Sequence, residues 1–169
     1  MAKQKNVHVG GQQLPLLTPY SSWQAAPELP DLRKHRRIAI DTEGKDDGLR
    51  AGVGPGWATG AGHLIGVGVA WRENKSYVGE YLPIRHPDTS GQFQPDQIKR
   101  WLNDHVKAGV RIVMQNAPFD WGWLNKDLGV TIPEGDQIDD TTAMAVMLDE
   151  NRIEGYDLNS LCRWQGIPG

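Results

Sequence analysis

Three acidic residues follow apolar segments that could hold them at one edge of a sheet. Asp41 and Glu43 come at the end of the run 38–40, and Asp120 follows the β-branched run 110–115. Alternation along a strand puts the side chains of Asp41 and Glu43 on the same side. Grouped carboxylates repel each other unless cations lie between them, and hard oxygen ligands suit Mg²⁺ or Mn²⁺. Two such ions about 3.5–4 Å apart can activate a water and stabilise the leaving oxygen of a phosphodiester.

Each candidate also has a structural interpretation, and position alone leaves both open. Asp41 and Glu43 can be turn residues, and Asp120 can be a helix N-terminal charge favoured by the dipole. Asp140, followed by a threonine, is favoured as a helix cap over a substitute metal ligand. Two tryptophans are secondary candidates for the cleft, although core or surface packing is favoured for both: Trp57, which could cover a nucleotide, and Trp123.

A basic run, residues 33–37, directly precedes the first strand of the domain. A solvated approach to the strand is the simpler interpretation of this run, and a contact with phosphate is the other. The chain as a whole carries a net charge of −3, so no strongly basic surface indicates a duplex-wrapping protein.

The elements that must position the acidic residues follow from apolar periodicity and from turn residues. Strands are predicted over 38–42, 63–71, 76–84 and 110–115, and helices over 95–108, 118–128, 140–149 and 157–164. The glycine-rich stretch 45–62 is predicted to be a loop. The strands 63–71 and 76–84 should pair antiparallel, whereas 110–115 should be parallel to 38–42 because a helical crossover separates them. In the helix 140–149 the predicted apolar stripe is Ala143, Met144, Met147 and Leu148.

This order predicts one α/β domain, a mixed sheet flanked by helices, over residues 35–169. Residues 1–34 are predicted to be an extended N-terminal arm that packs partly on the domain. No apolar run has the eighteen or so residues that a membrane span needs, so no membrane partner is expected. The chain has one cysteine and no apolar signal segment, which favours a reducing compartment, the cytoplasm, or the host cytoplasm if the gene is from a phage.

Two motifs resemble those of a known superfamily. The segment Ile-Ala-Ile-Asp-Thr-Glu-Gly (38–44) resembles the first motif of the DnaQ-like (DEDD) 3′–5′ exonucleases. The segment 114–124 is similar to their second motif, with Asn116, Phe119 and Asp120 at matching places. Residues 140–161 resemble the connecting helices of proofreading domains in phage-type family A DNA polymerases.

The resemblance implies a ribonuclease-H-like fold and a two-metal site. It makes Asp41, Glu43 and Asp120 the ligands of two Mg²⁺ or Mn²⁺ ions. It also implies that Thr42 offers a backbone contact to the terminal nucleotide, and that Asn116 and Phe119 line a single-strand channel. The implied partners are a single-stranded or frayed DNA 3′ end and the remainder of a polymerase or exonuclease chain.

One part of the family pattern is missing. Family members carry a third motif, Tyr-x-x-x-Asp or His-x-x-x-x-Asp, and none of the four tyrosines or five histidines has an aspartate at that offset. The chain is therefore expected to be the N-terminal portion of a longer exonuclease, with the C-terminal part of the fold missing. Three functions are consistent with the sequence: a proofreading 3′–5′ exonuclease, a non-catalytic nucleic-acid-binding or polymerase-docking module, and an RNA 3′-end trimming exoribonuclease.

Overall fold

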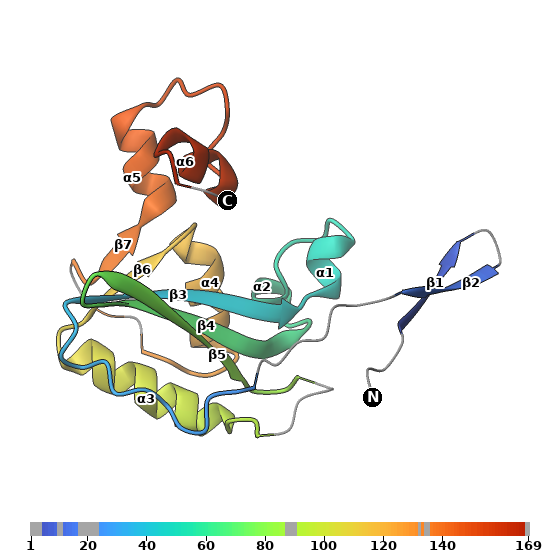
Figure 1. Ribbon diagram of the computed structural model, residues 1–169, viewed down its shortest axis with the longest axis horizontal. Coiled ribbons are helices and arrows are strands. Elements are labelled where there is room, and N and C mark those ends of the chain that lie inside the picture. The colour runs from blue at the N-terminus through green and yellow to red at the C-terminus, as the bar shows by residue number, and fades with distance from the viewer. Residues whose placement is uncertain are drawn as a thin grey trace.

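The structure is a computed structural model that describes residues 5–9, 12–16, 24–86, 91–131, 133 and 136–167, the first two ranges by their backbone only. A five-stranded mixed sheet forms its centre (Figure 1). Its strands are β3 (Arg37–Lys45), β4 (His63–Glu73), β5 (Ser76–Pro83), β6 (Arg111–Met114) and β7 (Ile138–Asp140). The spatial order is β5-β4-β3-β6-β7, so the first strand of the sheet in sequence lies in its middle.

The strand directions agree with the connections. The short turn at Asn74, whose φ is +54°, joins β4 to β5 as an antiparallel pair, and β3 also pairs antiparallel with β4. Helical connections lead to β6 and β7, and the pairs β3–β6 and β6–β7 are parallel. The pairings predicted from sequence for β4–β5 and β3–β6 are thus confirmed, and the α/β class with a mixed sheet flanked by helices is confirmed as well.

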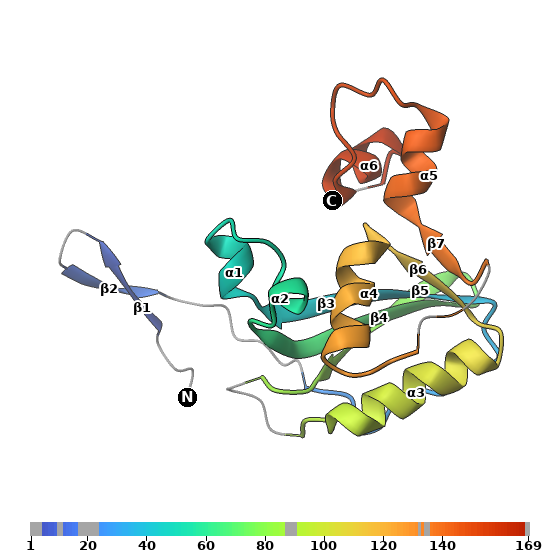
Figure 2. The same cartoon turned by 180° about the vertical axis from the view of Figure 1, so that it is seen from behind.

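Two helices cover one face of the sheet, as Figure 2 shows. Helix α3 (Pro95–Lys107) begins with proline and a capping box at Gln94, and the chain reverses at Gly109, whose φ is +79°. It buries Ile98, Trp101 and Leu102. Helix α4 (Ala117–Lys126) packs beside it, against β3 and β6. The core therefore lies between the sheet and these two helices, where it includes Ile38, Ile40, Val67, Ile112 and Leu124.

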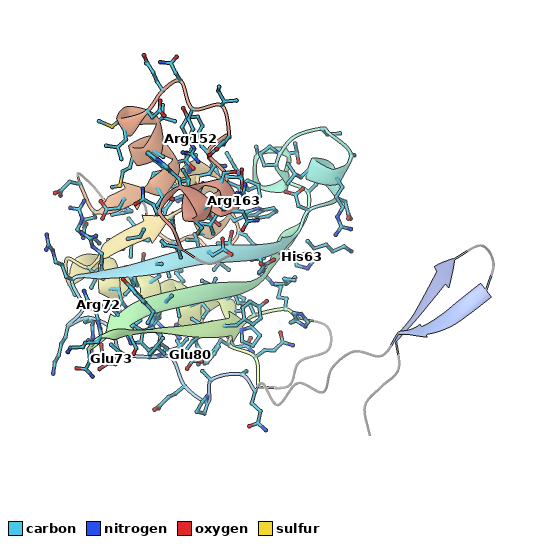
Figure 3. The ribbon with its side chains drawn as sticks, turned by 45° about the horizontal axis from the view of Figure 1, so that its top comes forward. His63, Arg72, Glu73, Glu80, Arg152 and Arg163 are labelled. Atoms are coloured by element: carbon cyan, nitrogen blue, oxygen red, sulfur yellow. The ribbon has the colours of Figure 1, made fainter. Side chains whose placement is uncertain are left out.

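The other face of the sheet is open over its central strands in the part of the chain that the structure describes (Figure 3). Alternation puts Ala39, Asp41 and Glu43 of β3 on this face, because Ile38, Ile40 and Thr42 are buried on the helical side. Small residues from neighbouring strands, Gly68 and Ala70 among them, stand directly beside them. The predicted alternation of Asp41 and Glu43 is confirmed.

The segment before β3 packs on α3. The indole Nε1 of Trp101 donates a 2.7 Å hydrogen bond to the carbonyl of Pro30, and the amide of Leu32 donates a 2.9 Å bond to Nε2 of His105. Leu32 itself is buried in the core. Earlier in the chain, β1 (Lys5–Val9) and β2 (Gln12–Leu16) pair as an antiparallel hairpin that the sequence analysis does not predict. Much of the predicted arm, residues 1–4, 10–11 and 17–23, lies outside the described residues.

Three further elements were not predicted. The stretch 45–62 contains two single-turn helices, α1 (Asp47–Arg50) and α2 (Gly56–Thr59), in place of a continuous loop. Strand β7, Ile-Asp-Asp, is too short and too acidic to show a strand pattern. Helices α5 (Thr141–Leu148) and α6 (Leu158–Trp164) lie at the predicted positions, but they stand above the sheet (Figure 1).

The predicted apolar stripe of α5 is not buried. Met147 and Leu148 are 87% and 75% exposed, and Ala145 is the buried apolar residue of this helix. Periodicity identifies an apolar face without identifying what covers it, and this face is largely exposed. Among the helices described, none is long and apolar enough to cross a bilayer.

Candidate functional site

The site begins with a hydrogen-bonded link between β3 and α4. The carboxylate oxygen Oδ1 of Asp120 accepts two hydrogen bonds from Thr42, one from the amide at 2.9 Å and one from the hydroxyl at 2.6 Å. Asp120 is only 3% exposed and lies in the first turn of α4. A parallel strand that ends at Met114 leads into this helix, so the carboxyl ends of β3 and β6 bring the two residues together.

The electrostatics of Asp120 indicate that a second carboxylate is close. Burial raises the pKa of Asp120 to about 6, although the two hydrogen bonds from Thr42 act to lower it. The negative charge of Asp41 contributes to the increase. Asp41 is exposed on the open face, but neighbouring atoms desolvate its carboxylate enough to raise its pKa as well. Burial is thus the main cause of the raised pKa of both carboxylates, and the charge of Asp41 adds a smaller increase at Asp120.

Glu43 lies on the same face, beside a residue that the sequence analysis missed. The ring of Tyr81 on β5 crosses Gly66 of β4, where a Cβ atom would come within 2.0 Å of the tyrosine hydroxyl. Gly66 pairs with Glu43 across the β3–β4 ladder. Burial raises the pKa of Tyr81, and the charge of Glu43 raises it further. A glycine on the strand next to a tyrosine carries no sequence signal until the strand register is known.

The donor atoms fit a hard divalent cation in type. Asp41, Glu43 and Asp120 offer carboxylate oxygens, and the raised pKa values of the first and third are typical of carboxylates that lack a compensating positive charge. Within the described ranges no three histidine, cysteine, aspartate or glutamate side chains are gathered closely enough to ligate one ion. Asp120 is bonded to Thr42, the residue between Asp41 and Glu43 on β3, so the three carboxylates belong to one end of β3.

The residues predicted to touch nucleic acid have different surroundings. Both donors of Thr42, its amide and its hydroxyl, already bind Asp120. Asn116 is exposed and has a left-handed backbone (φ +59°), a conformation that asparagine tolerates and that is often found at functional sites. Phe119 is half-buried against the core.

Asp140 is a structural residue, as the cap interpretation predicts. Its Oδ1 accepts hydrogen bonds from the amides of Thr142 (2.8 Å) and Ala143 (3.4 Å) at the start of α5. The same carboxylate also accepts from the amides of Asn116 (3.1 Å) and Ala117 (3.0 Å) at the start of α4. One side chain therefore fixes the start of two helices.

The two tryptophan candidates are packed inside the protein. Trp123 is 2% exposed, in agreement with the favoured packing interpretation, and it lies against Gly56 and Gly62 of the glycine-rich stretch. Trp57 is half-buried against the core and lies on Gly122, where a Cβ atom would come within 2.3 Å of its ring. Covering a nucleotide would therefore require Trp57 to leave this contact.

Asp46 organises the segment that follows the first motif. It is 9% exposed, and its two carboxylate oxygens each accept a 2.8 Å hydrogen bond, one from the amide of Leu49 and one from the amide of Gly56. It caps α1 and ties that helix to the start of α2, so the glycine-rich stretch has a fixed shape beside the acidic residues.

Comparisons with family models and with curated proteins found no match for this chain.

Proposed function

We propose that this chain is the metal-binding part of a DnaQ-like 3′–5′ exonuclease that hydrolyses phosphodiester bonds at DNA 3′ ends. The observation that carries the proposal is the Thr42–Asp120 link, which holds a buried carboxylate of α4 against β3 at the residue that follows Asp41. The sheet order and the two parallel crossovers support a ribonuclease-H-like fold. The two motif resemblances support the same superfamily.

Each residue of the site has a proposed role. Asp41, Glu43 and Asp120 would hold Mg²⁺ or Mn²⁺, which when bound would supply Lewis-acid activation of water and stabilisation of the leaving oxygen. Thr42 orients Asp120 by donating two hydrogen bonds to the same oxygen, so that the carboxylate is fixed before a cation arrives. Asn116 is exposed at the end of β6, within reach of a strand that enters the site.

The first test is cleavage. DNA labelled at its 3′ or 5′ end is incubated with the chain and Mn²⁺, and we expect stepwise shortening from the 3′ end. Asp41→Asn should abolish it, whereas Asp104→Asn, which removes the same charge from the exposed side of α3, should not. Shortening that survives Asp41→Asn, Glu43→Gln and Asp120→Asn would contradict the site.

The second test is metal linkage. At a cation concentration one hundred times Kd, binding should stabilise the fold by about 2.7 kcal/mol, which raises Tm by roughly 5–10 °C for a chain of this size. Asp41→Asn should remove most of the increase. An equal increase in Asp41→Asn and Asp104→Asn would mean that the cation binds elsewhere.

A non-catalytic docking module is the second candidate, and the exposed apolar residues of α5 and the following loop favour it. Met147, Leu148 and Ile153 are 87%, 75% and 100% exposed, which is unusual for side chains with no partner surface. Nucleic-acid binding without shortening, together with no metal-dependent change in Tm, would support this candidate over the first.

A further inference from the structure

The open face of the sheet has a basic hollow at the end opposite the acidic residues. Its volume is about 620 Å³, and it forms around the start of β3 and the end of β4. The charged and aromatic side chains that line it are His35, Arg36, Arg37, Trp71, Arg72 and Tyr77. Figure 3 labels Arg72 at the end of β4 that is remote from His63.

Three guanidinium groups in this hollow have no ion-pair partner among the described residues: Arg36, Arg37 and Arg72. Arg72 donates a 3.2 Å hydrogen bond to the carbonyl of Asn74, which leaves its charge uncompensated. Positive charges gathered in one hollow of a chain whose net charge is −3 attract anions to that place.

The nearby carboxylates already have partners. Asp139 binds Arg111, and this contact, ahead of the more distant Arg37 and Arg36, lowers the pKa of Asp139. Glu73 accepts a 3.2 Å hydrogen bond from the indole of Trp71 and lies 3.9 Å from Nε2 of His35. Neither acid is therefore the missing partner of the three arginines.

An exposed aromatic ring lies beside the arginines. Tyr77 pairs with Arg72 across the β4–β5 ladder and is 80% exposed. A ring this open, next to guanidinium groups, is typical of surfaces on which nucleic-acid bases stack while arginine binds the backbone. Trp71 is less able to stack on a base, because it is half-buried and already contacts Glu73 and His35.

The basic hollow continues to the acidic residues. It shares Ala39, Ala70 and Val113 with a second hollow of about 550 Å³, which extends to Asp41 and Gly68. The floor between them consists of small side chains, so a strand can lie close to the sheet. Asp41 is four positions after Arg37 along β3, a distance of about 13 Å.

We propose that this groove binds single-stranded nucleic acid, with the backbone phosphates a few nucleotides from the end held by Arg37 and Arg72. The inference rests on the proposed function, because it takes the strand end to lie at Asp41 and Asp120. Asp41 makes the second hollow acidic, so the arginine end is the part of the groove that can hold phosphate by its own charge. Tyr77 stacks on a base next to these phosphates.

The test is metal-free binding, measured by fluorescence anisotropy with a labelled long oligothymidylate in EDTA. The double variant Arg37→Gln/Arg72→Gln should bind several-fold more weakly, and the slope of log K against log salt should fall by about 1.4 for two single-strand phosphates. Arg100→Gln/Lys107→Gln removes the same charge from exposed positions of α3 and should bind like the wild type. Tyr77→Ala should weaken binding without changing the slope.

Two outcomes would overturn the inference. One is equal affinity and equal slope in the two double variants. The other is inorganic phosphate competing as strongly as the oligothymidylate, because the hollow would then be a small-anion site. Failure of the proposed function would give a different result from both. The wild type would then show no Mn²⁺-dependent shortening of DNA, while the arginine-dependent binding in EDTA would still be observed.

Discussion

A buried carboxylate that lies beside another carboxylate destabilises the folded state once both are ionised. Asp120 is in this situation, since burial and the charge of Asp41 outweigh the two hydrogen bonds from Thr42 and raise its pKa from 3.8 to about 6. The folded protein therefore holds this proton more tightly than the unfolded chain does. The contribution of Asp120 to stability is most favourable below about pH 4 and declines as the pH rises to about 6.

Asp120→Asn should consequently stabilise the metal-free protein at neutral pH. The amide oxygen can still accept both hydrogen bonds from Thr42, and the lost charge corresponds to roughly 3 kcal/mol for a pKa difference of about two. Urea unfolding in EDTA should show this gain above about pH 6 and no difference from the wild type below about pH 4. A variant that is less stable than the wild type at neutral pH would mean that the ionised carboxylate is favourable there.

Asp120 and its neighbours show which features of the site can be predicted from the sequence. The position of Asp120 after a parallel strand, and the shared side of Asp41 and Glu43, follow from periodicity alone. Tyr81 does not, because its contact with Gly66 depends on a register between strands that no local pattern records. The double use of Thr42 as an orienting donor also depends on a contact across 78 residues of sequence.

At the scale of elements, one carboxylate, that of Asp140, joins two helices that are separate in the sequence. Asp140 accepts hydrogen bonds from four amides, two at the start of α5 and two at the start of α4. Asp157 is the ordinary case, an N-cap that accepts from the amide and the hydroxyl of Ser160 in its own helix, α6. The two residues form a natural comparison.

Asp140→Ala should cost more stability than Asp157→Ala. Loss of one N-cap costs about 1 kcal/mol, and the amide of the buried Ala117, left without its acceptor, adds about 1–3 kcal/mol. We expect roughly 2–4 kcal/mol for Asp140→Ala and about 1 kcal/mol for Asp157→Ala, measured by thermal unfolding of both variants. Equal losses would show that the contacts of Asp140 with α4 are energetically neutral.

Element boundaries were predictable where a cap or a breaker marks them. Pro95 begins α3, Gly109 follows its end, and Asp140 and Asp157 precede α5 and α6. The two turns of helix after the first motif were not predictable, because Asp46 and the packing of Trp57 on Gly122 stabilise them against the local preference of a glycine-rich segment.

At the scale of the whole molecule, the buried core is concentrated between the sheet and helices α3 and α4. Helices α5 and α6 bury few side chains, among them Ala145, Ser160 and Leu161. Gln115 is one of their attachments, since its amide donates 2.7 Å hydrogen bonds to the hydroxyl of Thr142 and the carbonyl of Tyr156. Local stability should therefore differ between the two parts of the molecule.

Native-state hydrogen exchange should resolve this difference. Amides of β3, β4 and α3 should exchange only with global unfolding, whereas amides of α5 and α6 should exchange through a smaller opening of lower free energy. Gln115→Ala should lower the free energy of that opening further and leave the exchange of β3 unchanged. A single free energy for all protected amides would mean that the two parts unfold together.

The central place of β3 in the sheet determines when the acidic site can form during synthesis of the chain. During synthesis, β4 and β5 follow β3 directly and can form an antiparallel meander, but β6 and α4 come only after the whole of α3. Until then the free edge of β3 is open and Asp120 has no place beside Asp41. A nascent or interrupted chain therefore has two of the three acidic residues, Asp41 and Glu43, without Asp120, so any activity that needs all three begins only when the parallel half of the sheet has closed.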